Sequence, residues 1–394
     1  MEAVTRPPKG SAARTYYPHV EGLRGVAAMY VFLYHAWQYG ILHAGATLPG
    51  LLPFTLPWLQ FGHFAVSVFI VISGYVLGLP VAQRLQSPFS PGRFAKRRIR
   101  RLMPAYVLAL FLSIIPFCLM AILLGRHPNA KHIAVAVIAH LALIHNWILP
   151  LAEYLNGPMW SIALECQIYV FFALLLIPVW KRFGPWAQLA VALVIGLLPH
   201  FLFHGRFDYT IWWLMGLFGM GVVAAHITAN KPARAPFWRL LALLAAALAL
   251  VAITRSGEGT PDSNLWPADL IVGAAISLMF VTSDGEKLTW TARFLSLRPI
   301  VILGTFSYSL YLVHGPLVAL VGAALQHINA GVTISAIAWG ATIVLVPALA
   351  YCFYLIAERP FLSAGFREAI EKSPDHERLY VPDDGAVSTS QSTT

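Results

Sequence analysis

Charged residues are scarce in this chain. Only 11% of its 394 residues are charged, against about 25% in a soluble domain, and 58% are hydrophobic. The formal net charge of +10 lies mostly in segments between apolar runs, which is where membrane proteins carry basic residues. We therefore expect a polytopic membrane protein with membrane lipid as a partner, and we expect no binding of nucleic acid.

Cysteine is also scarce, and its pattern excludes two kinds of site. The three cysteines lie scattered in apolar runs without a Cys-x-x-Cys motif, so neither a disulfide framework nor a thiolate metal site is expected. The chain lacks the Gly-x-Ser-x-Gly motif that holds a serine nucleophile. Its first 20 residues are polar and basic, without the apolar core of a cleaved signal peptide.

Eleven apolar runs approach the ~20 residues that a transmembrane helix needs. With a cytoplasmic N-terminus, eleven crossings would place 12 Lys and Arg residues inside and 14 outside. If one run, 132–150, enters and leaves on the same side, 22 lie inside and 4 outside, as the positive-inside rule favours. The runs cover residues 22–42, 61–80, 103–124, 132–150, 159–179, 186–204, 210–228, 237–254, 267–283, 299–324 and 331–356.

The predicted fold is therefore all-α, with about ten transmembrane helices, a re-entrant helix and both termini in the cytoplasm. The histidines and asparagine of the run 132–150 suit a wet cavity better than lipid. No metal is expected there, because His140 and His145 are five residues apart and do not share a helical face. We expect a cytoplasmic tail over residues 1–20, a membrane domain over 21–361, and a cytoplasmic, largely disordered tail over 362–394.

Two polar residues interrupt the first apolar run. Arg24 stands near its start and His35 follows eleven residues later, which puts both on one helical face, roughly 16 Å apart along the axis. An ionisable residue inside a span is costly unless it is paired, and it marks a candidate functional site. For His35 the alternative is a neutral histidine that makes an interhelical hydrogen bond.

The most basic segment, 81–103, holds seven Lys and Arg residues. Arg98 and Arg101 are three residues apart, so they share a helical face, and Pro104 is expected to begin the next helix. Because arginine forks match phosphate oxygens, this pair predicts a phosphate clamp. The alternative is a charge that only sets orientation and contacts anionic lipid.

Two later helices carry polar stripes. Ser161, Glu165 and Tyr169 recur every four residues in an apolar helix, and Tyr311 and His314 share a face of another. A carboxylate inside a span needs a partner or water, so Glu165 is a second candidate functional residue. A structural ion pair for Glu165 and a core hydrogen bond for His314 are the alternatives.

These segments, in this order, resemble the acyltransferase-3 family of integral-membrane O-acyltransferases. GLRGVAAMYVFLYHA is similar to the family's opening Arg-x10-His segment, and FIVISGYVLG resembles its Phe-hydrophobic-Ser-Gly-aromatic segment around Ser73. FAKRRIRRLMPAY resembles its Arg-x-x-Arg…Pro stretch, and WSIALECQIY its Trp-Ser…Glu…Gln…Tyr helix. SYSLYLVHGP and ERPF match the closing spans. The resemblance covers roughly residues 16–361, and Cys166 departs from it where the family commonly has a second acidic residue.

The resemblance implies a polar pore, a cytoplasmic acyl-coenzyme A as donor and a catalytic role for His35. Arg24, Arg98 and Arg101 would then hold the phosphates of the donor. His35 would act as general base on an acceptor hydroxyl, with Glu165 to orient it. The residues expected to line the substrate pore are Ser73, Trp160, Ser161, Tyr169, Tyr311 and His314.

The acceptor stays open between a polysaccharide of the cell envelope, a lipid-linked sugar and a small glycosylated product, with acetyl as the default acyl group. The competing function is a transporter or flippase for a polar or lipid-linked glycan, with His35 and Glu165 as proton relays. The two matching halves that many transporters show are not evident in this sequence. A purely structural or sensory protein would leave the basic pair and the polar stripes unexplained.

Overall fold

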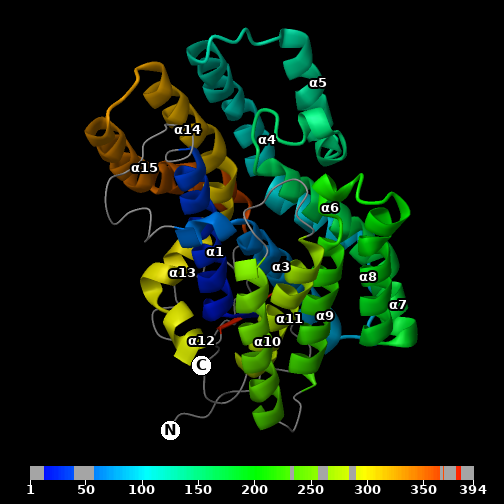
Figure 1. Ribbon diagram of the computed structural model, residues 1–394. Helices are drawn as coiled ribbons and strands as arrows, with labels where there is room; N and C mark the ends of the chain where they lie inside the picture. Colours follow the sequence, from blue (N-terminus) through cyan, green and yellow to red (C-terminus); the bar gives the residue numbers. More distant parts are fainter. Residues whose placement is uncertain are drawn as a thin grey trace, which may run out of the picture.

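The computed structural model describes residues 13–39, 57–230, 235–255, 265–283, 290–363, 367 and 379–382. These residues form a bundle of helices (Figure 1). The helices are α1 (Pro18–Trp37), α3 (His63–Gln83), α4 (Pro91–Leu123), α5 (Ala130–Leu141), α6 (Met159–Phe171), α7 (Ile177–Phe183), α8 (Pro185–Leu202), α9 (Leu214–Ala229), α10 (Ala235–Arg255), α11 (Trp266–Ser283), α12 (Trp290–Leu295), α13 (Arg298–Thr305), α14 (Ser307–His327) and α15 (Val332–Phe353).

The all-helical membrane fold is confirmed. Within the described residues, eight helical segments are long and apolar enough to cross a membrane by length and composition. Two further expected spans correspond to α1, which has charged residues in its first two turns, and to α9, which has only 16 residues. One of the eight is continuous over α6, the π-helical turn η5 (Phe172–Leu176) and α7.

Two helix boundaries differ from the prediction. α4 begins at Pro91, not at Pro104, because Ser90 accepts a hydrogen bond from the Arg93 amide and Pro91 suits the first turn. The basic segment is therefore helical, and its 33 residues extend over about 50 Å, beyond a hydrocarbon core of about 30 Å. The run 299–324 is interrupted at Phe306, which ends α13 and leads into α14.

The segment after α4 makes less than a full crossing. α5 has 12 residues, about 18 Å of helix, and short 3-10 turns follow it, including η3 (His145–Trp147). Gln167 of α6 fixes this turn, because its amide donates to the Leu143 carbonyl at 2.7 Å and to Asn146 at 2.9 Å. The short helix agrees with a re-entrant segment, and re-entry itself stays a prediction.

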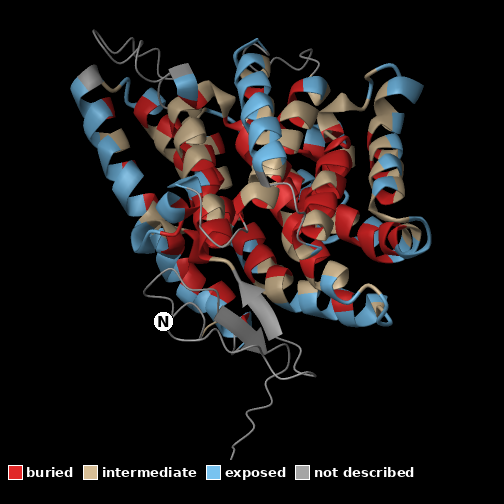
Figure 2. Cartoon of the chain, turned by 90° about the horizontal axis from the view of Figure 1, so that it is seen from below, coloured by how far each residue is buried: buried red, intermediate tan, exposed pale blue. Residues whose placement is uncertain are grey.

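Close helix contacts depend on glycine. A Cβ on Gly74 of α3 would lie 2.1 Å from the Phe218 carbonyl oxygen of α9, and one on Gly221 would lie 2.3 Å from the Val71 carbonyl oxygen. Small residues let helix backbones approach in this way inside membranes. The buried residues gather in the middle of the bundle and the exposed ones at its rim (Figure 2).

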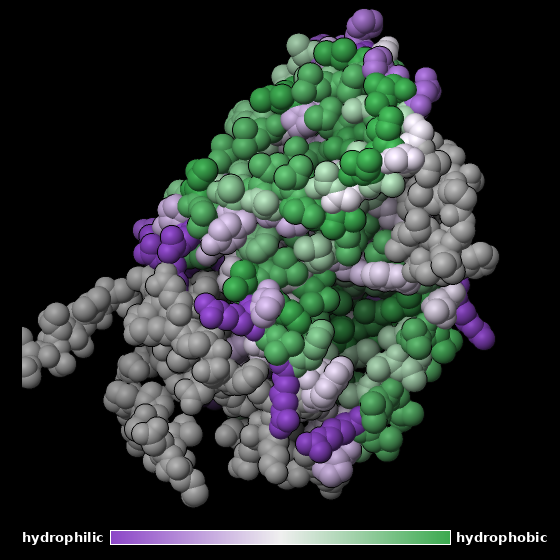
Figure 3. Space-filling model, turned by 90° about the vertical axis from the view of Figure 1, so that its left-hand side faces the viewer, coloured by the Kyte–Doolittle hydropathy of each residue, from purple (hydrophilic) through white to green (hydrophobic). Residues whose placement is uncertain are grey.

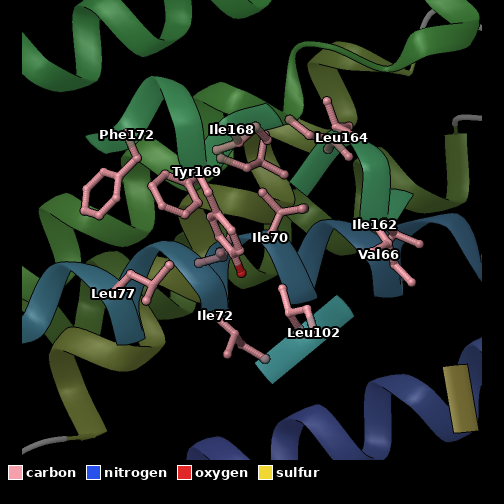
Figure 4. Close-up of a cluster of buried hydrophobic side chains, with 14 of the residues drawn as sticks. Val66, Ile70, Ile72, Leu77, Leu102, Ile162, Leu164, Ile168, Tyr169 and Phe172 are labelled. Carbon is pink, nitrogen blue, oxygen red and sulfur yellow. The ribbon is translucent and has the colours of Figure 1, made fainter. Parts of the chain in front are cut away.

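The core fills the space between α3 and α6. Ile70 and Leu77 of α3 pack with Ile168 and Phe172 from the α6 segment, and Leu102 of α4 lies beside them (Figure 4). On the outside, hydrophobic side chains dominate the middle of one face, and hydrophilic ones lie toward its upper and lower ends (Figure 3). That banding is what a lipid-embedded surface requires.

Two contacts bear on which segments share a side of the membrane. Strand β1 (Ala13–Tyr16) pairs antiparallel with β2 (Leu379–Pro382), a pairing that was not predicted and that falls within the tail expected to be disordered. Because β1 and β2 pair, these two strands lie on the same side of the bundle, as an even number of crossings would place them. Lys181 donates to the Ser87 carbonyl at 2.5 Å, so the end of α7 and the α3–α4 turn also share a side.

Candidate active site

His35 pairs with a second histidine. The Nδ1 atom of His35, on α1, lies 3.0 Å from Nε2 of His314, on α14. His314 is fully buried, whereas His35 is half-buried. Asn156 helps to set the position of α14, because its amide donates to the Leu312 carbonyl at 2.8 Å, two residues before His314.

The hydrogen-bond partners fix the tautomer of each ring. Nδ1 of His314 lies 2.9 Å from the Leu310 carbonyl, which can only accept, so Nδ1 carries the proton and Nε2 is an acceptor. Nδ1 of His35 therefore donates, both to His314 and to the Val31 carbonyl at 3.0 Å. The remaining nitrogen of His35, Nε2, then has a bare lone pair. It makes no hydrogen bond within the described residues, so it is the nitrogen that can accept a proton.

The polar stripe on α6 is confirmed as one face that meets two other helices. Ser161 lies 2.7 Å from the Tyr311 hydroxyl of α14, and the Tyr311 ring contacts the His314 ring edge-on at 5.7 Å. Glu165 and Tyr169 face Ser73 of α3. Trp160, in the first turn of α6, is half-buried against the main core.

Glu165 has partners other than His35. Tyr169 donates to its Oε1 at 2.5 Å, and Ser73 donates to the same oxygen. No hydrogen bond joins Glu165 to His35 in the described part of the chain, so the structure does not bring the two together as expected. The side chain that contacts the His35 ring is that of His314 instead. The i, i+4 pattern placed Glu165 on the inner face, but it could not tell which helix lay opposite.

The three predicted arginines lie near buried polar side chains of the site. Arg24 forms an ion pair with Glu21 at 3.4 Å and lies within electrostatic range of Glu165. Arg98 and Arg101 are half-buried, whereas the other basic residues of this segment, Arg93, Lys96, Arg97 and Arg100, are exposed. Arg98 lies within electrostatic range of Tyr169, and its guanidinium carbon is 6.0 Å from the centre of the Phe94 ring.

Glu358 is a site residue that the sequence reasoning missed. It ends the π-helical turn η7 (Tyr354–Glu358), is 3% exposed, and accepts a hydrogen bond from Ser309 at 2.7 Å. It lies within electrostatic range of Arg24 and Arg101, so it links two of the three arginines. The available signal was an acidic residue directly after the last apolar run, in the ERPF segment.

Comparison with known proteins decides the family. Residues 17–357 match acyltransferase-3, described as an acyltransferase domain. The chain belongs to this family. It is 27% identical over 315 residues to a protein named as a membrane-bound transacylase, BcsY, of Komagataeibacter xylinus, covering 75% of this chain and 72% of BcsY. It is 24% identical over 383 residues to the O-acetyltransferase OatA of Staphylococcus aureus, covering 89% of this chain.

The match reaches only 58% of the length of OatA, so the likeness concerns only that part of OatA. No solved structure matches this chain. The protein is thus a membrane-bound, multi-pass acyltransferase of the OatA and BcsY type. This membership favours an enzyme over the transporter considered above.

A stacked pair of buried histidines lies apart from the His35–His314 pair. The His140 and His145 rings stack, with centres 3.7 Å apart and planes 7° apart. The two residues do not share a helical face, because α5 ends at Leu141, but the following turn folds His145 back against His140, a contact that was not predicted. Parallel rings direct their lone pairs side by side rather than at one point. Among the described residues, no group of three or more His, Cys, Asp or Glu is arranged to hold a metal.

A second buried carboxylate was not predicted. Asp269 of α11 is fully buried and accepts hydrogen bonds from Ser67 at 2.5 Å and from Trp213 at 2.7 Å. His63 lies 2.9 Å from the same carboxylate. These contacts join α3, the start of α9 and α11, and they satisfy the carboxylate inside the bundle.

Proposed function

We propose that this acyltransferase moves an acyl group, with acetyl as the default, from cytoplasmic acyl-coenzyme A to a hydroxyl of a cell-surface or lipid-linked glycan. The observation that carries the proposal is the His35–His314 hydrogen bond, which leaves Nε2 of His35 as a proton acceptor. An acceptor hydroxyl has a pKa far above 7, so it needs a base as it attacks, and a neutral imidazole suits that task.

The chemistry can be written as a direct transfer. The acceptor oxygen attacks the thioester carbonyl while Nε2 of His35 takes the hydroxyl proton. A C–O ester bond forms, the C–S bond breaks, and the proton passes from His35 to the departing thiolate. The reaction consumes no net proton. His314 would stabilise the imidazolium of His35 while the proton resides there, since its Nε2 accepts from the opposite ring nitrogen.

The positions of Arg24, Arg98 and Arg101 support a donor that enters the site from the end of the bundle where these arginines lie. A coenzyme A head group carries several phosphates, and arginine binds phosphate through paired, charge-assisted hydrogen bonds. Arg24 and His35 lie on one face of α1, roughly 16 Å apart along the axis. The long, thin arm of a coenzyme A whose phosphates are held at Arg24 would therefore place its thioester near His35 and His314. Arg98 and Arg101, the inward pair of α4, would share the phosphates with Arg24.

The positive-inside count supports cytoplasmic termini, with the arginines at the inner surface of the cytoplasmic membrane. The acceptor would then approach His35 from the other side. The name of OatA, an O-acetyltransferase, supports a hydroxyl as the acceptor group and acetyl as the group moved.

The proposal is tested with the purified full chain in proteoliposomes. We expect acetyl-coenzyme A on the arginine side and a soluble glycan on the other to give free thiol and O-acetylated glycan in equal amounts. His35→Gln at matched protein level should give neither product. Thiol release without ester formation, or ester formation by His35→Gln within a few-fold of the wild type, would contradict the proposal. Mass spectrometry of envelope glycans from a deletion strain would then identify the natural acceptor.

A further inference from the structure

The outward face of α4 carries a shallow, open groove that the proposed transfer reaction does not use. Its volume is about 590 Å³. One residue comes from the 3-10 turn η8 (Arg359–Phe361), which packs on α4. Only one lining residue is charged. The lining residues are Ile99, Arg100, Met103, Pro104, Val107, Leu108, Phe111 and Phe361.

The groove runs along the helix from a charged end to an apolar end. From Arg100 to Phe111 the helix rises roughly 16 Å, close to half of a hydrocarbon core of about 30 Å. The basic turns of α4 lie before Arg100, so the charged end is the one nearest the membrane surface. The apolar end continues toward exposed Leu112 and Ile115. A groove of this length fits one acyl chain of one leaflet.

Arg100 differs from its inward neighbours. Arg98 lies near the Tyr169 hydroxyl and Arg101 lies near the Glu358 carboxylate, so both have polar neighbours inside the bundle. Arg100 is exposed and makes no hydrogen bond or ion pair with any other residue that the structure describes. A guanidinium at the lipid surface is matched by a phosphate, which its planar fork binds well.

We infer that this groove is a binding site for an anionic phospholipid of the leaflet on the arginine side, with the phosphate on Arg100 and one acyl chain along Met103, Val107 and Phe111. The positive charge of Arg100 favours a headgroup with net negative charge, because the choline of a zwitterionic lipid would place a second positive charge beside the guanidinium. The groove is about as long as one leaflet is thick, so it suits the acyl chain of a phospholipid better than a long polyprenyl chain. The inference does not depend on the transfer chemistry, since none of these side chains belongs to the proposed site.

Native mass spectrometry of the full-length protein in detergent tests the site, with phosphatidylglycerol and phosphatidylcholine offered in equal amounts. We expect preferential retention of phosphatidylglycerol by the wild type. Arg100→Gln should weaken that retention about fivefold and should weaken the retention of phosphatidylcholine less, so that the preference between the two lipids falls. Leu108→Trp, a change at an exposed position that fills the groove, should reduce the retention of both lipids. The matched control is Arg126→Gln, which removes the same charge just beyond the other end of α4 and should behave as wild type.

Three results would overturn the inference. Equal retention of the two lipids by the wild type would mean an unselective lipid contact. Unchanged retention in Arg100→Gln would remove the headgroup site. Tighter retention of a polyprenyl phosphate than of phosphatidylglycerol would assign the groove to an isoprenoid carrier instead.

Discussion

Replacing His314 by leucine separates the roles of the two paired histidines. Leucine is close to histidine in volume, so the buried site stays filled, but the acceptor for the His35 proton is lost. The Val31 carbonyl, also 3.0 Å from Nδ1 of His35, still holds that proton in place. The tautomer of His35 is therefore kept, and only one hydrogen bond is removed.

The expected magnitudes differ clearly between the two positions. Loss of one hydrogen bond costs about 0.5–1.5 kcal/mol, which corresponds to a fall in kcat of roughly 2- to 13-fold for His314→Leu. Loss of a general base costs about 10²–10⁴-fold, which is the fall expected for His35→Gln. The KM for acyl-coenzyme A should change little in either variant, because neither histidine is among the residues proposed to bind the phosphates of the donor.

The assay follows thiol release and acylated acceptor together, at matched protein level, with thermal stability of the detergent-solubilised protein as the control for folding. If His314→Leu lost as much activity as His35→Gln while remaining folded, the roles of the two rings would have to be exchanged. If His35→Gln stayed within a few-fold of wild type, His35 would be a structural residue, and Glu165 would become the next candidate.

Three further predictions follow from other parts of the fold. Cysteine labelling should report the cytoplasm at Lys181 and the opposite side at Arg206, and the reverse at either position would refute the ten-crossing topology. Alanine at Arg98 or Arg101 should raise the KM for acyl-coenzyme A by roughly 10- to 150-fold, because each charge-assisted contact is worth about 1.5–3 kcal/mol. The KM for the acceptor should change less. An unchanged KM for the donor would mean that these arginines serve only to orient the protein in the membrane. Gly74→Ala should lower the melting temperature or prevent folding, because the Cβ of the alanine would lie 2.1 Å from a backbone carbonyl oxygen of α9. A melting curve like that of the wild type would show that the two helices can move apart.

Periodicity in the sequence predicted which faces point inward. The stripe Ser161–Glu165–Tyr169 and the pair Arg98–Arg101 both face the bundle, because side chains three or four apart share a helical face whatever the neighbours are.

Which helices meet was beyond that reasoning. His35 was expected to meet Glu165 and instead meets His314, since the partner depends on how α1 and α14 pack over the whole chain. The start of α4 was misplaced because a proline that suits a first turn, Pro104, also fits inside a long helix, and the Ser90 cap fourteen residues before it was overlooked. Glu358 escaped notice because nothing local shows that a residue at the end of an apolar run will be enclosed.

The His35–His314 contact also has a consequence for biogenesis. The two residues are 279 positions apart in the chain, so at about 5–20 residues per second the ribosome needs roughly 14–56 s to supply the second ring after the first. α1 is among the first segments to enter the membrane, and α14 is the last but one of the long helices. A nascent chain therefore carries an unpaired His35 through most of its insertion, and the dyad is completed only when nearly the whole bundle is present. Chains that terminate before α14 would therefore lack the His35–His314 pair altogether.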